Sequence, residues 1–289
     1  MKPITVALAS VAIVSTVASL ASCSAWSRGK PSAKLSDRAY VALLTPSGAG
    51  FNAGYSGGVE YTENGGKNWI AGTNRSVCMF AAEITRSGTC FATGNGSNFI
   101  VSTNGGKNWQ KKENIGGSIG KSVSFADDTT GWAASTSWLG QTENAGSAWT
   151  TLTLPADFGL VETICCAGKG AGYVLSMEGR LFATTDGGSS WTERAAPFPK
   201  SDESFKPLWG RKTQGAAIRF TGDSGVAAAI GKDAGKPALL VRTSEDGGVT
   251  WSSAKKFPFV LAPLACTIDP DGNVTVFNAD TTATLIARK

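Results

Sequence analysis

The chain has 289 residues, with 36 glycines, 9 tryptophans, no histidine and a formal net charge of +5. Abundant glycine beside alternating apolar residues predicts an all-β chain rich in turns. The lack of histidine excludes histidine triads and the commonest metal ligand, and the basic residues are too scattered for a nucleic-acid patch. We therefore expect no cofactor, no metal site and no nucleic-acid partner.

The first 22 residues read as a signal peptide. Lys2 is followed by an apolar run from Ile4 to Leu20, which is too short and too polar for a membrane-spanning helix. The run ends in Leu20-Ala21-Ser22-Cys23, which resembles the lipobox of bacterial lipoproteins. This resemblance implies that Cys23 carries a lipid and becomes the mature N-terminus.

The polar residues 23–37 are then the tether of an exported, membrane-anchored protein on the periplasmic or extracellular face. In a host with two membranes, Ser24 favours the outer membrane. The alternative is ordinary signal-peptidase cleavage nearby, with no lipid on Cys23.

Five similar octets follow along the chain. Their tryptophans are separated by 40, 40, 42 and 60 residues, and a period near forty in a β-rich chain predicts propeller blades. Asn or Asp at the third position can accept backbone N–H groups, and glycine permits the positive φ of a tight turn. The octets are TENGGKNW (62–69), STNGGKNW (102–109), TENAGSAW (142–149), TTDGGSSW (184–191) and SEDGGVTW (244–251).

Residues 38–289 divide into six predicted blades of four antiparallel strands. The third blade is the clearest, with strands over 123–126, 132–136 and 138–141 before its octet. The last blade has three strands and no octet, so we expect residues 27–36 to supply its outer strand and close the ring. Seven blades would require a division of residues 192–251, which contain too few turn signals. The blades fall at 38–69, 78–109, 122–149, 162–191, 215–251 and 264–289.

The octet resembles the Asp-box, or bacterial neuraminidase repeat, S/T-x-D-x-G-x-x-W. Its copies are assigned to folding, since a turn and a buried indole stabilise a blade without chemistry of their own. Three copies carry Asn instead of Asp, which keeps the accepting oxygen and loses the charge. The structural residues are Asn64, Trp69, Asn104, Trp109, Asn144, Trp149, Asp186, Trp191, Asp246 and Trp251.

Ligands of propellers of this type usually bind on the face opposite the octets. There Trp138 interrupts loops that are otherwise rich in Gly, Ser and Asn, either as a contact residue or packed on a neighbouring loop. The insertion 194–214 is the best candidate for a partner-binding element. The candidate binding residues are Trp138, Arg180, Trp209 and Arg211.

Two family resemblances imply different functions. Sialidases share the Asp-box, but the chain has no Arg-Ile-Pro motif and no evident pair of catalytic carboxylates. The spacing in the third blade resembles the photosystem II assembly/stability-factor-like propellers, which are exported and non-catalytic. This resemblance implies a monomeric scaffold or assembly factor in the cell envelope that binds a protein or glycan, with a sialidase-like glycoside hydrolase as the alternative.

Five cysteines follow Cys23, namely Cys78, Cys90, Cys165, Cys166 and Cys266. An exported chain can form disulfides, and an odd count leaves at least one cysteine without an intramolecular partner. Cys78 and Cys90 flank a predicted hairpin and are the first candidates for a pair; the pairing of the others stays open.

Overall fold

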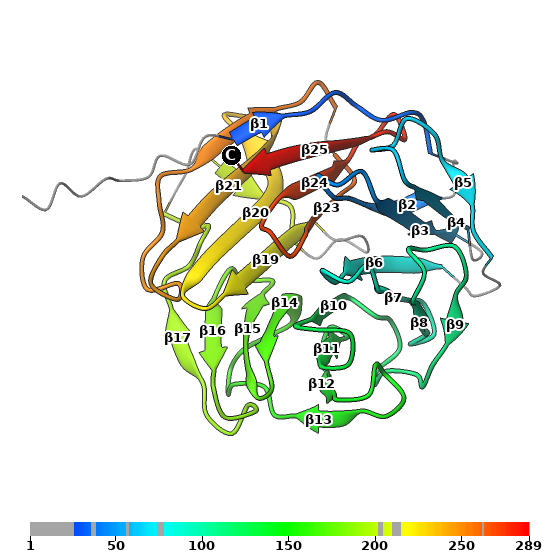
Figure 1. Cartoon of the computed structure of the whole chain (residues 1–289). Helices are drawn as coiled ribbons and strands as arrows, with labels where there is room; N and C mark the ends of the chain where they lie inside the picture. The colour runs from blue at the N-terminus through cyan, green and yellow to red at the C-terminus, as the bar shows by residue number, and fades with distance from the viewer. Residues whose placement is uncertain are drawn as a thin grey trace, which may run out of the picture.

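The structure is a computed structural model that describes residues 26–35, 39–55, 58–73, 78–201, 205–209, 215–261 and 263–288. The strands in these ranges form six antiparallel sheets arranged around a central axis (Figure 1). The predicted all-β propeller of six blades is confirmed. The signal peptide and Cys23 lie outside the described residues.

The blades follow one another in chain order. The first contains β2 (Ala39–Leu44), β3 (Gly50–Gly54), β4 (Val59–Thr62) and β5 (Ile70–Ala71). The second contains β6 (Met79–Ile84), β7 (Cys90–Gly94), β8 (Phe99–Ser102) and β9 (Gln110–Lys111). The third contains β10 (Ser122–Phe125), β11 (Gly131–Ala134), β12 (Leu139–Thr142) and β13 (Thr150–Leu152).

The fourth blade contains β14 (Val161–Gly168), β15 (Ala171–Ser176), β16 (Leu181–Thr184) and β17 (Thr192–Arg194). The fifth contains β19 (Ala216–Thr221), β20 (Ser224–Asp233), β21 (Lys236–Ser244) and β22 (Lys255–Pro258), with β18 (Phe205–Pro207) paired to the far end of β20. The sixth contains β23 (Ala265–Ile268), β24 (Val274–Phe277), β25 (Ala283–Arg288) and β1 (Trp26–Arg28).

The N-terminal strand completes the last blade, as the missing outer strand predicted. β1 pairs antiparallel with β25, and Trp26 lies opposite Arg288. The two ends of the described chain thus lie in one sheet, which covers the edge that β25 would otherwise expose. β1 starts inside the predicted tether, so part of that segment belongs to the propeller.

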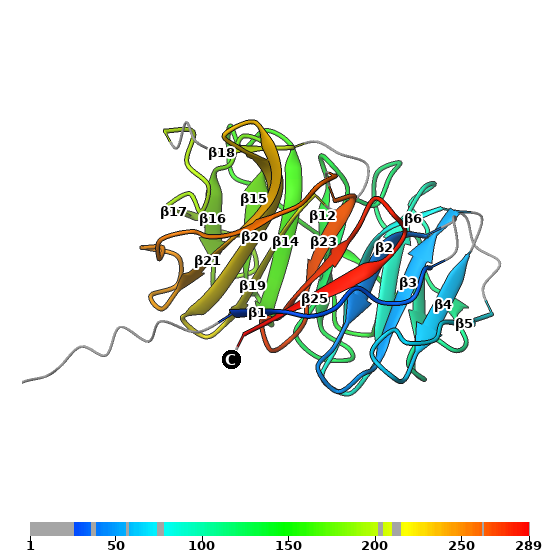
Figure 2. The ribbon, with the colours of Figure 1, turned by 90° about the horizontal axis from the view of Figure 1, so that it is seen from above.

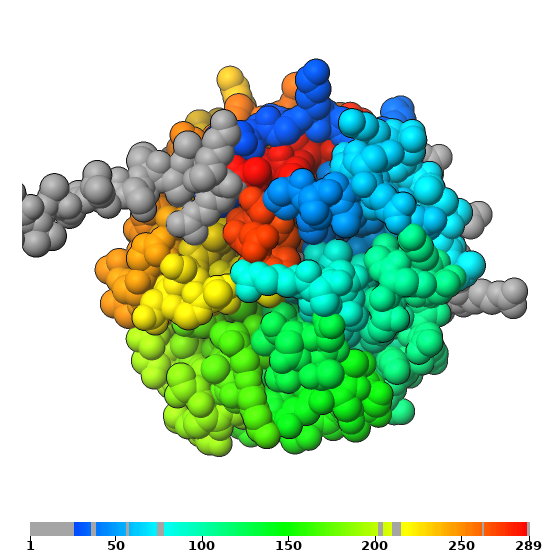
Figure 3. Space-filling model, viewed as in Figure 1, coloured from blue at the N-terminus to red at the C-terminus, as the bar shows by residue number. Residues whose placement is uncertain are grey.

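The innermost strand of each blade is almost completely buried because neighbouring blades pack against both of its faces. β6 and β10 have no exposed residue; the apolar run of β6 is interrupted by Glu83 and that of β10 by Ser122 and Ser124. The space-filling view shows neighbouring blades in contact around the centre of the disc (Figure 3). Burial of apolar side chains between blades therefore drives closure of the ring.

The disc has two distinct faces. One, here the corner face, carries the octets and the turns between the first and second strands of each blade. The other, here the loop face, carries the loops between second and third strands and the connections between blades. β18 and the C-terminal end of β25 lie on opposite sides of the disc (Figure 2). Within the described part of the chain, no helix has the length and apolar character needed to cross a membrane.

Two details differ from the predictions. The strands of the third blade begin and end at slightly different residues, because Ser135 donates its N–H to the Trp138 carbonyl at 2.9 Å and closes a tight turn. Cys78 and Cys90 are both free thiols. The register pairs Cys90 with Ile84 while Met79 pairs with Gly94, so the two cysteines lie at opposite ends of the hairpin.

Candidate functional site

The five octets fold into one repeated corner. The hydroxyl of the first position donates to the Oδ1 atom of the third position, at 2.8 Å from Thr184 to Asp186. The same hydroxyl accepts the N–H of the fifth position, at 3.0 Å from Gly188. The Oδ1 atom also accepts the N–H of the seventh position, at 2.9 Å from Ser190. Equivalent bonds occur at Asn64, Asn104, Asn144 and Asp246.

The corners with Asp differ from those with Asn at the seventh position. Ser190 and Thr250 donate their hydroxyls to the second carboxylate oxygen of Asp186 and Asp246, both at 2.6 Å. An Asn amide has no second oxygen to accept such a bond. These hydroxyl bonds are the main cause that lowers the pKa of each carboxyl to about 2. The charged carboxylates of Asp186 and Asp246 therefore stabilise their own turns.

The tryptophan of most corners joins its blade to the preceding segment. The indole N–H of Trp191 donates to the Thr153 carbonyl at 2.8 Å, and that of Trp251 donates to the Ala195 carbonyl at 2.9 Å. Trp69 and Trp149 make equivalent bonds across the preceding blade boundary. Trp109 instead bonds to Gly106 within its own corner. Each indole also packs between sheets, so the corners act in assembly of the ring.

Trp138, on the loop face, is largely occupied by internal contacts. Its indole N–H donates to Thr151 Oγ1 at 3.0 Å, and its ring packs edge-on against Trp149 at 6.2 Å between centroids. A Cβ atom added at Gly116 or Gly140 would lie within 2.5 Å of the indole, so both residues must be glycine for the ring to fit. These contacts correspond to the packing role, one of the two roles that the sequence left open for Trp138.

Arg180 and Trp209 lie near each other at the fourth blade, which follows the blade of Trp138 in the chain. Arg180 holds Glu193 through two hydrogen bonds of 2.9 Å and donates to the Asp157 carbonyl at 2.8 Å. Trp209 packs on Phe198 and reaches the backbone next to Arg180, 3.6 Å from the Cβ position of Gly179. Arg211 lies outside the described residues. The structure therefore brings two of the four candidates together beside the insertion.

Sequence reasoning missed the ion pairs inside the ring. Arg219 of β19 pairs with Glu83 of β6, across the axis, and donates to the Phe125 carbonyl at 3.2 Å. Lys121 and Glu162 form a second buried pair at 3.3 Å. Burial raises the pKa of Glu83 to about 7, although Arg219 opposes this shift. The signal available in the sequence was a charged residue inside three of the apolar inner strands, namely Glu83, Glu162 and Arg219.

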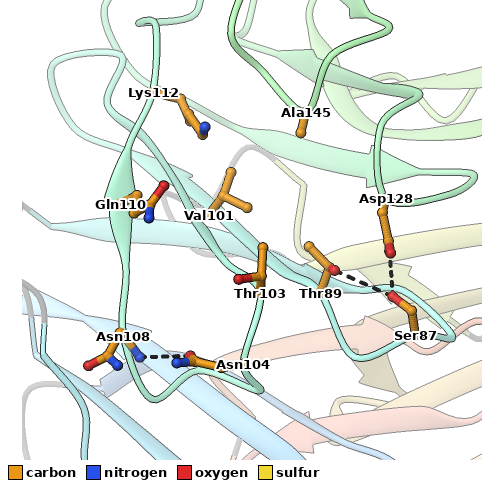
Figure 4. Close-up of a pocket in the computed structure, with 10 residues that line it drawn as sticks. All are labelled: Ser87, Thr89, Val101, Thr103, Asn104, Asn108, Gln110, Lys112, Asp128 and Ala145. Carbon is orange, nitrogen blue, oxygen red and sulfur yellow. Dashed lines mark hydrogen bonds between the residues drawn. The ribbon is translucent and has the colours of Figure 1, made fainter.

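A groove of about 490 Å³ lies on the corner face between the second and third blades. Gln110 and Lys112 lie on its wall from the second blade, and Asp128 lies on its wall from the third (Figure 4). Asp128 accepts hydrogen bonds from Thr85 and Ser87 at 2.6 and 2.5 Å, which join the two blades. The carboxylate is thus held in place by the interface that it completes.

The loop face carries most of the exposed large hydrophobic side chains. Among the described residues, five of the seven exposed large hydrophobic side chains lie there, and only Val249 lies on the corner face. They belong to the loop of the first blade and to three connections between blades. These residues are Tyr55 (52% exposed), Ile119 (37%), Leu160 (48%), Val260 (95%) and Leu261 (64%).

Comparison with known proteins agrees with this architecture. A family model described as photosynthesis system II assembly factor YCF48 matches residues 141–258, less than half of the chain. A BNR/Asp-box repeat model matches residues 100–111, which include the second octet. The Asp-box propeller is confirmed. No curated protein matches the chain.

Solved structures resemble this Asp-box propeller at the level of the fold. YCF48 from Cyanidioschyzon merolae is 16% identical with a TM-score of 0.51, over 90% of this chain and 98% of that one. The WD40 repeats of RRP9 are 10% identical with a TM-score of 0.60, over 91% and 100%. An ancestral GH74 enzyme is 18% identical with a TM-score of 0.52, over 84% of this chain and 35% of that one. The chain thus spans about a third of the length of that enzyme, and the fold accommodates both enzymes and other proteins.

Proposed function

We propose that this propeller is a non-catalytic scaffold or assembly factor that binds another protein through its loop face. The observation that carries this proposal is the concentration of exposed hydrophobic side chains on that face. Exposed apolar side chains that gather on one face mark interaction surfaces, because their burial in a complex is favourable. The match to an assembly-factor model over residues 141–258 supports the same role.

The state of the axial carboxylates also supports binding without catalysis. Glycoside hydrolysis requires two carboxyl groups that face the substrate. Glu83 is paired with Arg219, and Glu162 is paired with Lys121. Asp269 accepts bonds from Asn273 and from the backbone of its own turn. These groups stabilise the ring, so their burial has a structural explanation.

The proposed setting is the bacterial cell envelope, with the propeller exported and anchored by a lipid on Cys23. Cleavage before Cys23 leaves β1 intact, because the strand begins at Trp26. A lipidated propeller therefore keeps its closed ring.

Site-specific photo-cross-linking tests the binding face. A benzoylphenylalanine placed at Leu160 on the loop face is expected to cross-link one partner in cells of the source organism. The same group at Val249, which is 51% exposed on the corner face, serves as the matched control. Mass spectrometry of the cross-linked species identifies the partner. Equal cross-linking at both positions, or none at Leu160, contradicts binding through the loop face.

An activity assay tests the absence of catalysis. The purified propeller is expected to show no turnover of sialosides or aryl glycosides. Turnover that a single carboxylate substitution abolishes would contradict the proposal and favour a sialidase-like enzyme.

A further inference from the structure

One region at the edge of the loop face combines positive charge with exposed aliphatic side chains. It lies at the end of the fifth blade and consists of Lys206, Lys232, Lys236, Val260 and Leu261, here the blade-5 tip. The three lysines are exposed, and the aliphatic pair follows β22 in the connection to the sixth blade.

Strand register brings these residues together. Lys206 of β18 lies opposite Lys232 of β20, and Lys236 begins the strand that follows the β20–β21 turn. The N–H of Phe259 donates to the Pro237 carbonyl at 3.0 Å, which holds the Val260–Leu261 segment beside this hairpin. Since Pro237 lies opposite Lys232, the aliphatic pair adjoins the lysines.

Among the described residues, no ion pair balances the three lysines of the tip. Asp233, the acidic residue of the hairpin, is paired with Lys256 at 2.6 Å. Within the described ranges, no ion pair reaches Lys206, Lys232 or Lys236. Placing like charges opposite one another, as Lys206 and Lys232 are, costs stability unless an anion lies nearby. The tip therefore presents three cations to an anionic surface.

The aliphatic pair projects from the rim of a small cavity, which it also lines. Val260 is 95% exposed and Leu261 is 64% exposed, next to a cavity of only about 220 Å³. Protein contacts usually centre on aromatic or arginine side chains that fill a fitted pocket. An aliphatic tip flanked by lysines matches a lipid surface instead, since acyl chains accommodate the tip without a preformed shape and anionic headgroups attract the lysines.

We propose that the blade-5 tip docks on an anionic phospholipid bilayer, with Val260 and Leu261 inserted among the acyl chains and the three lysines at the headgroups. Arg28 of β1 donates to the Pro258 carbonyl at 3.0 Å and stacks on Phe259, which holds the base of the tip against the N-terminal strand. A lipid at the predicted site Cys23 lies five residues before Arg28. Trp26 lies opposite Arg288 at the corner-face end of β25, away from the tip, so the docking is independent of the predicted lipid and of the proposed protein partner.

Vesicle flotation of residues 24–289 tests the proposal, since β1 and the closed ring lie within this segment. We expect binding to vesicles of phosphatidylcholine with phosphatidylglycerol, weak binding to phosphatidylcholine alone, and release by salt. The Val260→Asp/Leu261→Asp variant is expected to bind at least about tenfold more weakly, since two aliphatic side chains lose their insertion. The Lys206→Gln/Lys232→Gln/Lys236→Gln variant is expected to lose about tenfold or more.

Val249→Asp is the matched control, because Val249 lies on the corner face of the same blade with 51% exposure. Its binding is expected to equal that of the parent. As a direct probe of insertion, an environment-sensitive dye on Val260→Cys is expected to shift to the blue with anionic vesicles, while the dye on Val249→Cys does not.

Three results would overturn the proposal: no vesicle binding by the parent protein, equal loss in Val249→Asp, or a blue shift at both dye positions. If the parent ignores vesicles while the Leu160 cross-linker still captures a partner that Val260→Asp loses, the tip is a protein contact. The scaffold function then survives while the membrane docking fails.

Discussion

At the residue scale, the octets show that one turn can be built with either Asn or Asp, according to the residue at the seventh position. Both residues supply the Oδ1 acceptor, but only the carboxylate uses a second oxygen, which binds Ser190 or Thr250. Ala145 shows a further tolerance. It occupies a corner position that glycine fills in the other four copies, and its φ is 54°. The sequence variation among the octets is therefore compatible with a single geometry.

The two charged corners predict a pH dependence of stability. The folded pKa of Asp186 and Asp246 is about 2, below the ordinary value of 3.8. Their charge therefore contributes stability above pH 3.8, and this contribution is lost as the pH falls through about 2. The Asp186→Asn/Asp246→Asn variant is expected to lose less stability over that interval than the parent protein. Melting temperatures measured by circular dichroism across this pH range provide the check.

Asp157→Asn is the control for this experiment, because Asp157 is exposed and lies outside the corners. Its stability curve is expected to follow that of the parent. If the double variant also follows the parent curve, the two carboxylates do not stabilise their corners.

At the scale of the element, closure of the ring depends on a strand of three residues. Register pairs Trp26, Ser27 and Arg28 with the end of β25. The Trp26 side chain also packs against the core between the fifth and sixth blades. The local sequence around Trp26 is polar and would not predict a strand by itself. The prediction came from the last blade, which has only three strands in its own sequence and needs a fourth.

Removal of β1 is expected to destabilise the whole propeller. A chain that begins at Lys30 loses backbone hydrogen bonds of about 1 kcal/mol each, so its free energy of unfolding should fall by about 2–4 kcal/mol. It also exposes the edge of β25 to association with other chains. Urea unfolding and size-exclusion chromatography measure both effects, with a chain that begins at Ser24 as the control. Equal stability of the two chains would show that β1 does not close the ring.

At the scale of the whole molecule, a buried ion pair crosses the centre of the ring. Arg219 of the fifth blade meets Glu83 of the second and also binds the third through the Phe125 carbonyl. Its side chain is 9% exposed and that of Glu83 is 8% exposed. The second, third and fifth blades are thus held in one arrangement about the axis.

Removing one charge of this pair is expected to lower the free energy of unfolding far more than replacing both residues with apolar ones. Arg219→Met leaves a buried carboxylate without its cation, and such losses are about 3–5 kcal/mol. The Glu83→Leu/Arg219→Met variant removes both charges and should recover much of that loss. A double-mutant cycle by urea unfolding measures the coupling. Additive effects would show that the pair does not act as a unit.

Arg86→Met is the matched surface control. Arg86 pairs with Asp271 on the corner face, where both side chains are more than 60% exposed. Its removal is expected to change the stability little, because water screens the pair.

The sequence by itself determined the propeller, its six blades and the place of the closing strand. These features are local and repeated, since each octet specifies the same turn through neighbours within eight residues. Trp138 was correctly placed in a loop-face loop even though its strand boundary moved, because loops and turns carry their own residue preferences.

Only the tertiary structure decided which groups are free to act. The partners of Trp138, Arg180 and Glu83 come from other strands or other blades, and their distances in the sequence range from 11 to 136 residues. The blade-5 tip likewise depends on register, which places Lys206 beside Lys232 and the Val260 segment beside both. Periodicity predicts where a strand lies, but the surface that a side chain reaches depends on how the blades pack, and that is settled only when the ring closes.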